Sequence, residues 1–291
     1  MVIPIVEASE LSFGYGAGRW AVHNLSVSLA PSSRVCLLGT NGAGKSTLLM
    51  LLNGTLRPCA GNITVRGRAI DYSRAGLANL RREVGIVLQD PDDQLFAATV
   101  EQDVAFGPLN SGLGAVEARA CVRSILQELE IAHLADRPIH ELSLGEKKRV
   151  AIAGALVLGP SILLLDEPTA GLDHDGVTAL LGVLNRLHSR GASILLATHD
   201  TDLAYEWADD AWVLADGSIA ASGPAVEVLT DTTALKKAGL RVPFLAAAAL
   251  ECRAIWPDLD RVPLPATRED LFKQLWDVAA AERCGRTGGM V

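Results

Sequence analysis

The sequence has few cysteines, and their arrangement argues against two kinds of stabilising site. The 291-residue chain contains five cysteines, an odd number, with no Cys-x-x-Cys pair. Disulfide frameworks and zinc sites need cysteines in matched or closely spaced sets, so neither is expected. This use of cysteine is typical of a protein of the cytoplasm.

Long hydrophobic runs are also absent. The longest uncharged stretch, residues 150–165, has 16 residues and is interrupted by a Gly-Pro-Ser turn at 159–161. A helix needs roughly 20 apolar residues to span a bilayer, so we expect a buried helix, a turn and a buried strand here. The first residues include Glu7 and Glu10 and lack a basic start followed by an apolar run, so no signal peptide is expected.

Positive charge is scarce. Lysine and arginine number 26 against 34 aspartate and glutamate residues, which gives a formal net charge of −8. Binding of nucleic acid through counterion release needs a basic surface, so we expect no nucleic-acid partner. The chain does have 49% hydrophobic residues, enough for one large domain or for one domain with an appendage.

The hydrophobic pattern predicts an α/β fold. Residues 2–6 and the alternating segment 25–29 predict strands of an antiparallel sheet. Four short apolar runs, each followed by polar or glycine-rich residues, are typical of strands buried on both faces of a parallel sheet. These runs lie at 34–39, 84–89, 161–167 and 193–200. We expect ligand-binding residues at their carboxyl ends.

Helical periodicity predominates between the second and third of these runs. It predicts a helix at 116–129 and another that begins near Ser143, hence a helical subdomain of about residues 91–159. Asp216-Gly217 joins two short apolar runs and predicts a hairpin. The motifs end near Thr230. We expect a main domain at 1–230 and a helical extension at 231–291, where Thr267 offers a cap before an apolar stripe.

A glycine-rich segment predicts a phosphate site between a strand and a helix. Gly39 is followed after four residues by Gly44, Lys45 and Ser46. In this context the backbone N–H groups wrap the phosphates of a nucleotide, Lys45 reaches the β and γ phosphates, and Ser46 places a hydroxyl on Mg²⁺. The predicted phosphate-binding residues are Gly39, Asn41, Gly42, Gly44, Lys45, Ser46 and Thr47. The alternative is a glycine-rich turn that only opens a helix.

Two carboxylates, Asp166 and Glu167, end another predicted strand. Asp166 is placed to hold Mg²⁺, directly or through water, and Glu167 to polarise the water that attacks the γ phosphate. Taken alone, such a pair is as often part of a solvated loop. The phosphate motif upstream favours the catalytic interpretation.

Three further side chains near strand ends have both a functional and a structural interpretation. His199 is either catalytic or a structural histidine with satisfied hydrogen bonds. Gln89 either reaches the metal and the attacking water or is a surface amide. Tyr15 either stacks on an adenine or packs against its neighbours.

A second anion site is predicted where a helix begins. Ser143 and Glu146 have the Ser-x-x-Glu spacing of a capping box. Gly145 lets the backbone come close to a ligand, and the N-terminus of a helix favours phosphate. The chain therefore has two predicted phosphate sites far apart in the sequence.

Together these motifs resemble those of an ABC-type ATPase over about residues 3–230. In order they are the phosphate loop, Gln89, "LSLGE" at 142–146, "ILLLDEP" at 162–168, "AGLD" at 170–173 and His199. The resemblance implies a RecA-like parallel sheet, an antiparallel β subdomain and an inserted helical subdomain. It also implies ATP and Mg²⁺ as cofactors and two ATPase domains paired head to tail. Each ATP would lie between the phosphate loop of one subunit and the signature helix of the other, which explains two phosphate sites in one chain.

The resemblance also implies roles for single residues. Ser143 and Gly145 would contact the γ phosphate in trans, and Asp173 would couple the two subunits. His199 would sense the γ phosphate, and Tyr15 would stack on the adenine.

One departure from the family pattern lies in the signature. The usual sequence is Leu-Ser-Gly-Gly-Gln, whereas this chain has Leu144 and Glu146 at the third and fifth positions. Ser143 and Gly145, the expected phosphate contacts, are retained, so we expect the site to work. The departure bears on the rate and the affinity of the site.

Residues 89–110 give a narrower resemblance. Together with "KKRVAIAGAL" at 147–156, they resemble the energy-coupling factor ATPases, especially the cobalt type CbiO. The resemblance implies a peripheral subunit on the cytoplasmic face of the cell membrane that energises import of cobalt or nickel, or of a vitamin such as biotin. It implies three partners, namely a second ATPase subunit, a CbiQ-like transmembrane coupling subunit and a CbiM-like substrate-binding membrane subunit. By analogy, residues 231–291 would strengthen dimerisation.

Several alternatives remain open from the sequence. The acidic residues between 90 and 103 are also typical of a solvated surface. A soluble ABC ATPase of the iron-sulfur assembly type would have no membrane partner. A nucleotide switch without hydrolysis is disfavoured by Glu167 together with His199. The six histidines have no ligand-like spacing, so a transported metal ion is expected to be bound by other subunits.

Overall fold

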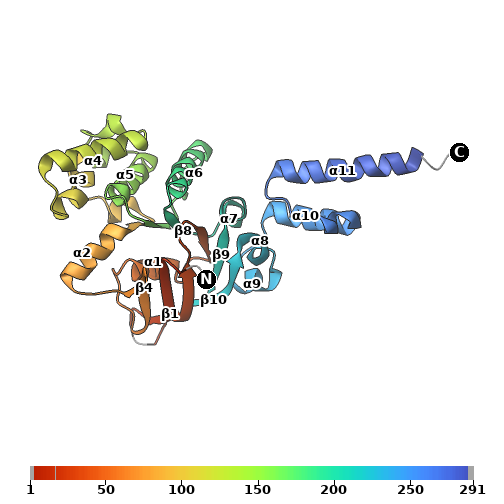
Figure 1. Ribbon diagram of the computed structural model, residues 1–291, viewed down its shortest axis with the longest axis horizontal. Helices are drawn as coiled ribbons and strands as arrows, with labels where there is room; N and C mark the ends of the chain where they lie inside the picture. The colour runs from red at the N-terminus through yellow and green to blue at the C-terminus, as the bar shows by residue number, and fades with distance from the viewer. Residues whose placement is uncertain (1–2, 17, 288–291) are drawn as a thin grey trace.

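A six-stranded sheet in the order β10-β9-β3-β8-β7-β6 forms the centre of the computed structural model, which describes residues 3–16 and 18–287 (Figure 1). Five of its strands run parallel, and β10 pairs antiparallel with β9. The strands are β3 (Arg34–Leu38), β6 (Val84–Val87), β7 (Ile162–Asp166), β8 (Ser193–Thr198), β9 (Asp210–Ala215) and β10 (Ser218–Pro224). The four predicted parallel strands are all present in this sheet.

Alternate residues of the central strands enter two different hydrophobic cores. In β7, Leu163 and Leu165 pack in a core with the helices at 100–156, whereas Ile162 and Leu164 pack in a core with α1 (Lys45–Leu52) and the second sheet. Each fully buried Leu or Ile stabilises the fold by about 1.5–3 kcal/mol relative to exposure. Burial on both faces is why these strands lack the alternating polar residues of a half-buried strand.

The second sheet is antiparallel, in the order β2-β1-β4-β5. Its strands are β1 (Val6–Phe13), β2 (Val22–Leu29), β4 (Ala60–Val65) and β5 (Arg68–Ala69). The strand predicted at 2–6 is wrong in its position, because β1 begins at Val6, and residue 2 lies outside the described residues. Pro4 has no N–H for a strand ladder, and Ile5 donates one hydrogen bond to the Leu29 carbonyl before regular pairing begins.

Helices α3, α4 and α5 lie between β6 and β7 in the sequence and pack on one another, and α5 also packs against β6 of the central sheet (Figure 1). They span Val100–Asn110, Ala115–Glu128 and Leu144–Leu156, with short 3₁₀ turns at Pro91–Asp93, Ala132–Leu134 and Ile139–Glu141. The two helices predicted in this region are thus present. Earlier in the chain, α1 (Lys45–Leu52) follows β3, and α2 (Arg74–Glu83) precedes β6.

The hairpin predicted at Asp216-Gly217 joins β9 to β10. Both turn residues have positive φ angles, 48° and 76°, as a tight two-residue hairpin turn requires. Three further helices follow β7, namely α6 (His174–Ser189), α7 (Thr201–Trp207) and α8 (Ala225–Val228).

The C-terminal part is helical, as the sequence predicts. It contains α9 (Thr232–Lys237), α10 (Phe244–Ile255), a 3₁₀ turn at Pro257–Arg261 and α11 (Arg268–Thr287). Helix α9 packs on β9 and β10, whereas α10 and α11 lie side by side and project from the rest of the molecule (Figure 1). Within residues 3–16 and 18–287, no helix has the length and hydropathy to cross a membrane.

Candidate nucleotide site

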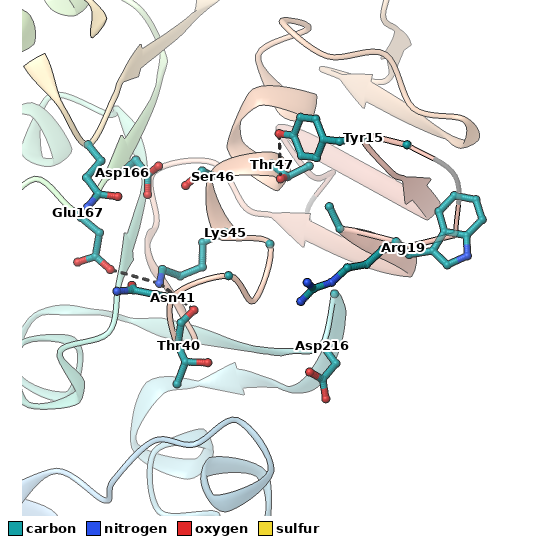
Figure 2. Close-up of a pocket in the computed structure, with 17 residues that line it drawn as sticks. Tyr15, Arg19, Thr40, Asn41, Lys45, Ser46, Thr47, Asp166, Glu167 and Asp216 are labelled. Carbon is teal, nitrogen blue, oxygen red and sulfur yellow. Dashed lines mark hydrogen bonds and ion pairs between the residues drawn. The ribbon is translucent and has the colours of Figure 1, made fainter. Parts of the chain in front are cut away.

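The glycine-rich loop joins the end of β3 to the first turn of α1 and forms one wall of a cavity (Figure 2). Gly42 and Gly44 have φ angles of 83° and 108°, a region that other residues rarely adopt. A Cβ atom on Gly44 would lie 2.3 Å from the carbonyl oxygen of Ala21. Glycine is therefore required at both positions for the backbone conformation, and at position 44 also for the close approach of Ala21. The free N–H groups at the start of α1 give the loop a preference for phosphate.

Lys45 is the first residue of α1, and its ammonium group is buried at the carboxyl end of β3. Its Nζ donates to the Gly39 carbonyl at 2.7 Å and forms an ion pair with Oε1 of Glu167 at 3.2 Å (Figure 2). The loop that follows β3 and the residue that follows β7 thus meet at the carboxyl edge of the sheet. The ammonium group that would bind phosphate is paired with a carboxylate in this structure.

Glu167 follows β7, and three side chains surround its carboxylate. Besides Lys45, the Nδ1 atom of His199 lies 3.0 Å from Oε1, and the Thr198 hydroxyl donates to Oε2 at 3.3 Å. Thr198 ends β8 and His199 follows it. The strand ends therefore bring the predicted base and the predicted histidine into direct contact. The φ angle of Glu167 is 45°, an uncommon left-handed conformation for a residue with a side chain.

Asp166 is buried beside Ser46 at the end of β7. Burial raises the pKa of its carboxyl group, and the nearby Glu167 charge raises it further. A hydrogen bond with Ser46 and the charge of Lys45 oppose this shift. Among the described residues, Oδ1 of Asp166 has no hydrogen-bond partner. An unpaired buried oxygen next to a hydroxyl fits Mg²⁺, which takes a few protein oxygens and completes its shell with phosphate and water.

The cavity between the phosphate loop and the segment 15–21 has a volume of about 690 Å³. Tyr15 lies at its outer side, 66% exposed, with its hydroxyl 3.2 Å from the Thr47 hydroxyl and its ring edge-on to Phe13 (Figure 2). One ring face is thus free for a flat ligand. Gln89 lines the same cavity. The lining residues are Tyr15, Gly16, Arg19, Trp20, Ala21, Thr40, Asn41, Gly42, Gly44, Lys45, Ser46, Thr47, Gln89, Asp166, Glu167, Asp216 and Gly217.

Ser143, Gly145 and Asp173 line a different cavity, of about 780 Å³, between α5 and α6. The predicted capping box is present, because the Ser143 N–H donates to Oε2 of Glu146 at 2.8 Å and the Glu146 N–H donates to the Ser143 hydroxyl at 3.3 Å. The two bonds from Ser143 lower the pKa of the Glu146 carboxyl group. Asp173 caps α6 by accepting from the Gly176 N–H at 2.8 Å.

The two predicted phosphate sites thus belong to separate cavities of one chain. The cavity of Lys45 has no lining residue in common with the cavity of Ser143 among the described residues. Sequence reasoning missed Arg19, Trp20 and Thr198, although Arg19 and Trp20 stand in the same glycine-rich segment as Tyr15. It also missed Lys148 of α5, for which the sequence gives no signal.

A parallel sheet with a glycine-rich phosphate loop after one strand, and with adjacent acids after another, defines a nucleotide-binding ATPase of the P-loop class. Comparison with known families makes the assignment narrower. The sequence profile of the ABC transporter family matches residues 22–170, and the chain belongs to this family as an ATP-binding ATPase subunit.

Known proteins resemble the chain over most of its length. The cobalt import ATP-binding protein CbiO of Rhodobacter capsulatus is 47% identical over 94% of this chain and 97% of its own length. The energy-coupling factor transporter ATP-binding protein EcfA of Methanocaldococcus jannaschii is 43% identical over 83% of this chain and 87% of its own. The solved structure of cbiO1 from Clostridium perfringens, described as part of the complex cbiONQ, has a TM-score of 0.71. It is 42% identical and covers 82% of this chain and 96% of that one.

Proposed function

We propose that the chain is the ATP-hydrolysing subunit of an energy-coupling factor importer, with cobalt or nickel ions as the solute. The observation that supports cobalt or nickel as the solute is the sequence identity to CbiO over nearly the whole of both chains. The similarity to EcfA supports the same type of subunit without naming a solute. Uptake of a vitamin such as biotin is the alternative within this type.

The contacts around Glu167 support the proposed site chemistry. The loop N–H groups and Lys45 bind the β and γ phosphates, and Tyr15 stacks on the adenine. Ser46, Gln89 and Asp166 would hold Mg²⁺, which neutralises the charge of the phosphates when it is bound.

Once Lys45 binds phosphate, Glu167 is left with His199 and Thr198 as its partners. It then accepts a hydrogen bond from the attacking water, with His199 orienting it and sensing the γ phosphate.

The separation of the two cavities supports a head-to-tail dimer. In one chain, Ser143 and Gly145 line a cavity that contains no residue of the phosphate loop. We assign to them the γ phosphate held by a second subunit, and to Asp173 the coupling between the two subunits. The N–H groups at the start of α5 supply the donors for this contact.

Exposed aromatic residues support docking of a transmembrane subunit at residues 89–110. Phe96 and Phe106 are exposed and stack edge-on, with ring centroids 4.7 Å apart, and Leu109 is exposed beside Phe106 in α3. Such a patch is typical of an interaction surface. We assign it to a CbiQ-like coupling subunit, which works with a CbiM-like substrate-binding subunit and holds this chain at the cytoplasmic face of the membrane.

The solute is proposed to be bound by those other subunits. Among the described residues, no group of three or more histidine, cysteine, aspartate or glutamate side chains could hold a metal ion. This chain would therefore supply energy and leave recognition of the solute to the membrane subunits.

The test is purification of the tagged chain from detergent-solubilised membranes, with every co-purifying subunit identified by mass spectrometry. Recovery of a transmembrane coupling subunit with a metal-binding membrane protein is expected. Recovery of a vitamin-binding membrane protein would change the solute and keep the mechanism. A preparation without any membrane protein would contradict the proposal and favour a soluble ABC ATPase of the iron-sulfur assembly type.

A further inference from the structure

Helix α5 carries a buried lysine that the chemistry described above does not use. Lys148 is 5% exposed, and lysine is rarely buried without partners. Its Nζ donates to three backbone carbonyls, those of Glu167 and Pro168 at 3.3 Å each and that of Ala170. These bonds use all three donors of the ammonium group and satisfy it away from water.

All three acceptors lie in one short loop, residues 167–173, which joins β7 to α6. The loop begins with the left-handed conformation of Glu167, which costs about 1–3 kcal/mol and persists only where the surroundings hold it in place. Two backbone bonds contribute, from Glu167 N–H to the Ala197 carbonyl at 2.9 Å and from Ala170 N–H to the Glu167 carbonyl at 3.2 Å. The ammonium group of Lys148 adds the remaining bonds from the side of α5.

The same loop packs against the first turn of α5. The Leu144 side chain lies so close to Gly171 that an added Cβ would be 2.8 Å from its Cδ2 atom. A Cβ on Gly145 would in turn lie 3.5 Å from Leu172. The start of α5, where Ser143 lies, is thus in contact with the loop that Lys148 holds.

We propose that Lys148 is a positioning residue for ATP hydrolysis. Its ammonium group fixes the backbone of the loop 167–173, from which Glu167 reaches the attacking water, and aligns this loop with the start of α5. The inference rests on the proposed role of Glu167. Lys148 does not line the cavity of the phosphate loop, although it does line the cavity of Ser143. Its effect is therefore on turnover and not on the binding of nucleotide at the phosphate loop. It also links the two cavities of one chain, because α5 borders one and Glu167 borders the other.

The test compares Lys148→Met, which keeps the length of the side chain and removes every donor, with Lys148→Gln, whose amide group restores two donors without charge. Turnover is measured per nucleotide-binding site, with sites counted by titration of a fluorescent ATP analogue. For Lys148→Met we expect kcat to fall about tenfold to a hundredfold, as for a displaced catalytic group, with the nucleotide Kd unchanged. Lys148→Gln is expected to recover part of the loss.

The matched control is Lys147→Met, on the same helix. The Lys147 ammonium pairs with Asp92 at 2.6 Å and does not contact the loop 167–173 in the described structure. Its kcat in the isolated ATPase is expected to equal that of the wild type. This comparison separates the loss of bonds to the loop from the loss of a lysine in α5.

Three results would overturn the inference. The first is a kcat per site in Lys148→Met equal to that of the wild type, and the second is an equal loss of kcat in Lys148→Met and Lys148→Gln. The third is a fall in the number of nucleotide-binding sites that accounts for the whole loss of ATP hydrolysis rate. The last result would make Lys148 a folding residue only. A wild-type chain that binds ATP without hydrolysing it would instead contradict the proposed function, so the two failures are distinguishable.

Discussion

The ion pair between Lys45 and Glu167 joins two buried charges that neutralise one another. Removal of one partner from such a pair leaves the other charge buried and costs about 3–5 kcal/mol. In the proposed mechanism, ATP supplies a second anion for Lys45, so its ammonium group would exchange the Glu167 carboxylate for a phosphate. Variants of these two residues therefore affect stability as well as chemistry, and each experiment needs a measurement of both.

Replacement of Glu167 by glutamine is expected to retain ATP binding and nearly abolish turnover. The amide occupies the same space but cannot accept a proton from water, and loss of a general base lowers rates about a hundredfold to ten-thousandfold. Steady-state phosphate release together with nucleotide titration checks this. Brisk hydrolysis by Glu167→Gln would contradict the role given to Glu167.

Replacement of Lys45 by methionine is expected to weaken ATP binding about tenfold to a hundredfold, since charge-assisted hydrogen bonds contribute about 1.5–3 kcal/mol. The variant is also expected to unfold at lower temperature, because Glu167 loses its cation. The double variant Lys45→Met, Glu167→Gln removes both charges and is expected to recover stability without recovering affinity. Unchanged nucleotide affinity in the single variant would refute the assignment of Lys45 to phosphate.

At the scale of elements, the start of α5 has a capping box that orders the helix, and it borders the cavity where we propose phosphate contact in trans. Glu146 stands where the family usually has glutamine, and its carboxylate accepts from both the N–H and the hydroxyl of Ser143. It therefore points back to the start of its own helix. The capping contact explains how a carboxylate is accommodated beside a predicted phosphate contact.

The pH dependence of stability tests this contact. Hydrogen bonds from Ser143 lower the pKa of Glu146 in the folded chain, so its ionised form stabilises the fold. That stability is present above the ordinary glutamate pKa of about 4.3 and is lost as the pH falls through the lower pKa of the folded state. Glu146→Gln is expected to be less stable than the wild type by about 0.5–1 kcal/mol at neutral pH, with the difference disappearing in acid.

Urea unfolding between about pH 3 and pH 8 measures this difference. Glu206→Gln is the control, because the exposed Glu206 carboxylate has no hydrogen bond or ion pair within the described residues. A difference between Glu146→Gln and wild type that does not vary with pH would contradict the charged cap.

The sequence predicts the elements well where the pattern is strong and local. Apolar runs identify the parallel strands, the Asp216-Gly217 pair identifies the hairpin, and strand ends identify Asp166 and Glu167. The burial of Lys148 could not be predicted, because Lys147 and Lys148 are equally polar and only the folded loop distinguishes them. The left-handed conformation of Glu167 likewise depends on contacts that are remote in sequence.

At the scale of the whole molecule, α10 and α11 place exposed apolar residues on the part that projects from the body (Figure 1). Phe272 and Trp276 of α11 are 70% and 72% exposed, and Phe244 and Ile255 of α10 are also exposed. Large exposed apolar side chains of this kind are typical of interaction surfaces, and a second copy of the chain is the occupant that we propose.

Deletion of residues 267–291 is therefore expected to weaken dimerisation. A cut after Thr230 would remove Leu235 and Leu245, which are buried in the main core, whereas a cut at 267 keeps them and also keeps the Pro265 carbonyl bonded to Tyr205. Light scattering over a range of concentrations without ATP is expected to give the monomer mass for the truncated chain and the dimer mass for the full chain.

Point variants refine this experiment. Trp276→Ala is expected to weaken the dimer by at least about tenfold, as buried aromatic residues dominate interfaces. Lys273→Ala, on the same exposed helix, serves as its control. Equal dimer masses for the truncated and the full chain would contradict a dimerising role for α11.

The order of strands in the central sheet governs when the nucleotide site can form during synthesis. Strand β3, which leads into the phosphate loop, has β8 and β9 as its two neighbours, and both lie more than half of the chain further on. On the ribosome, β3 therefore waits unpaired until β8, which ends at Thr198, has emerged, and it gains its second neighbour only with β9, which ends at Ala215. Pairing between such distant segments is slow and leaves apolar surface exposed meanwhile. A nascent chain is thus unable to bind ATP early, and nucleotide can stabilise only chains whose synthesis has passed β9.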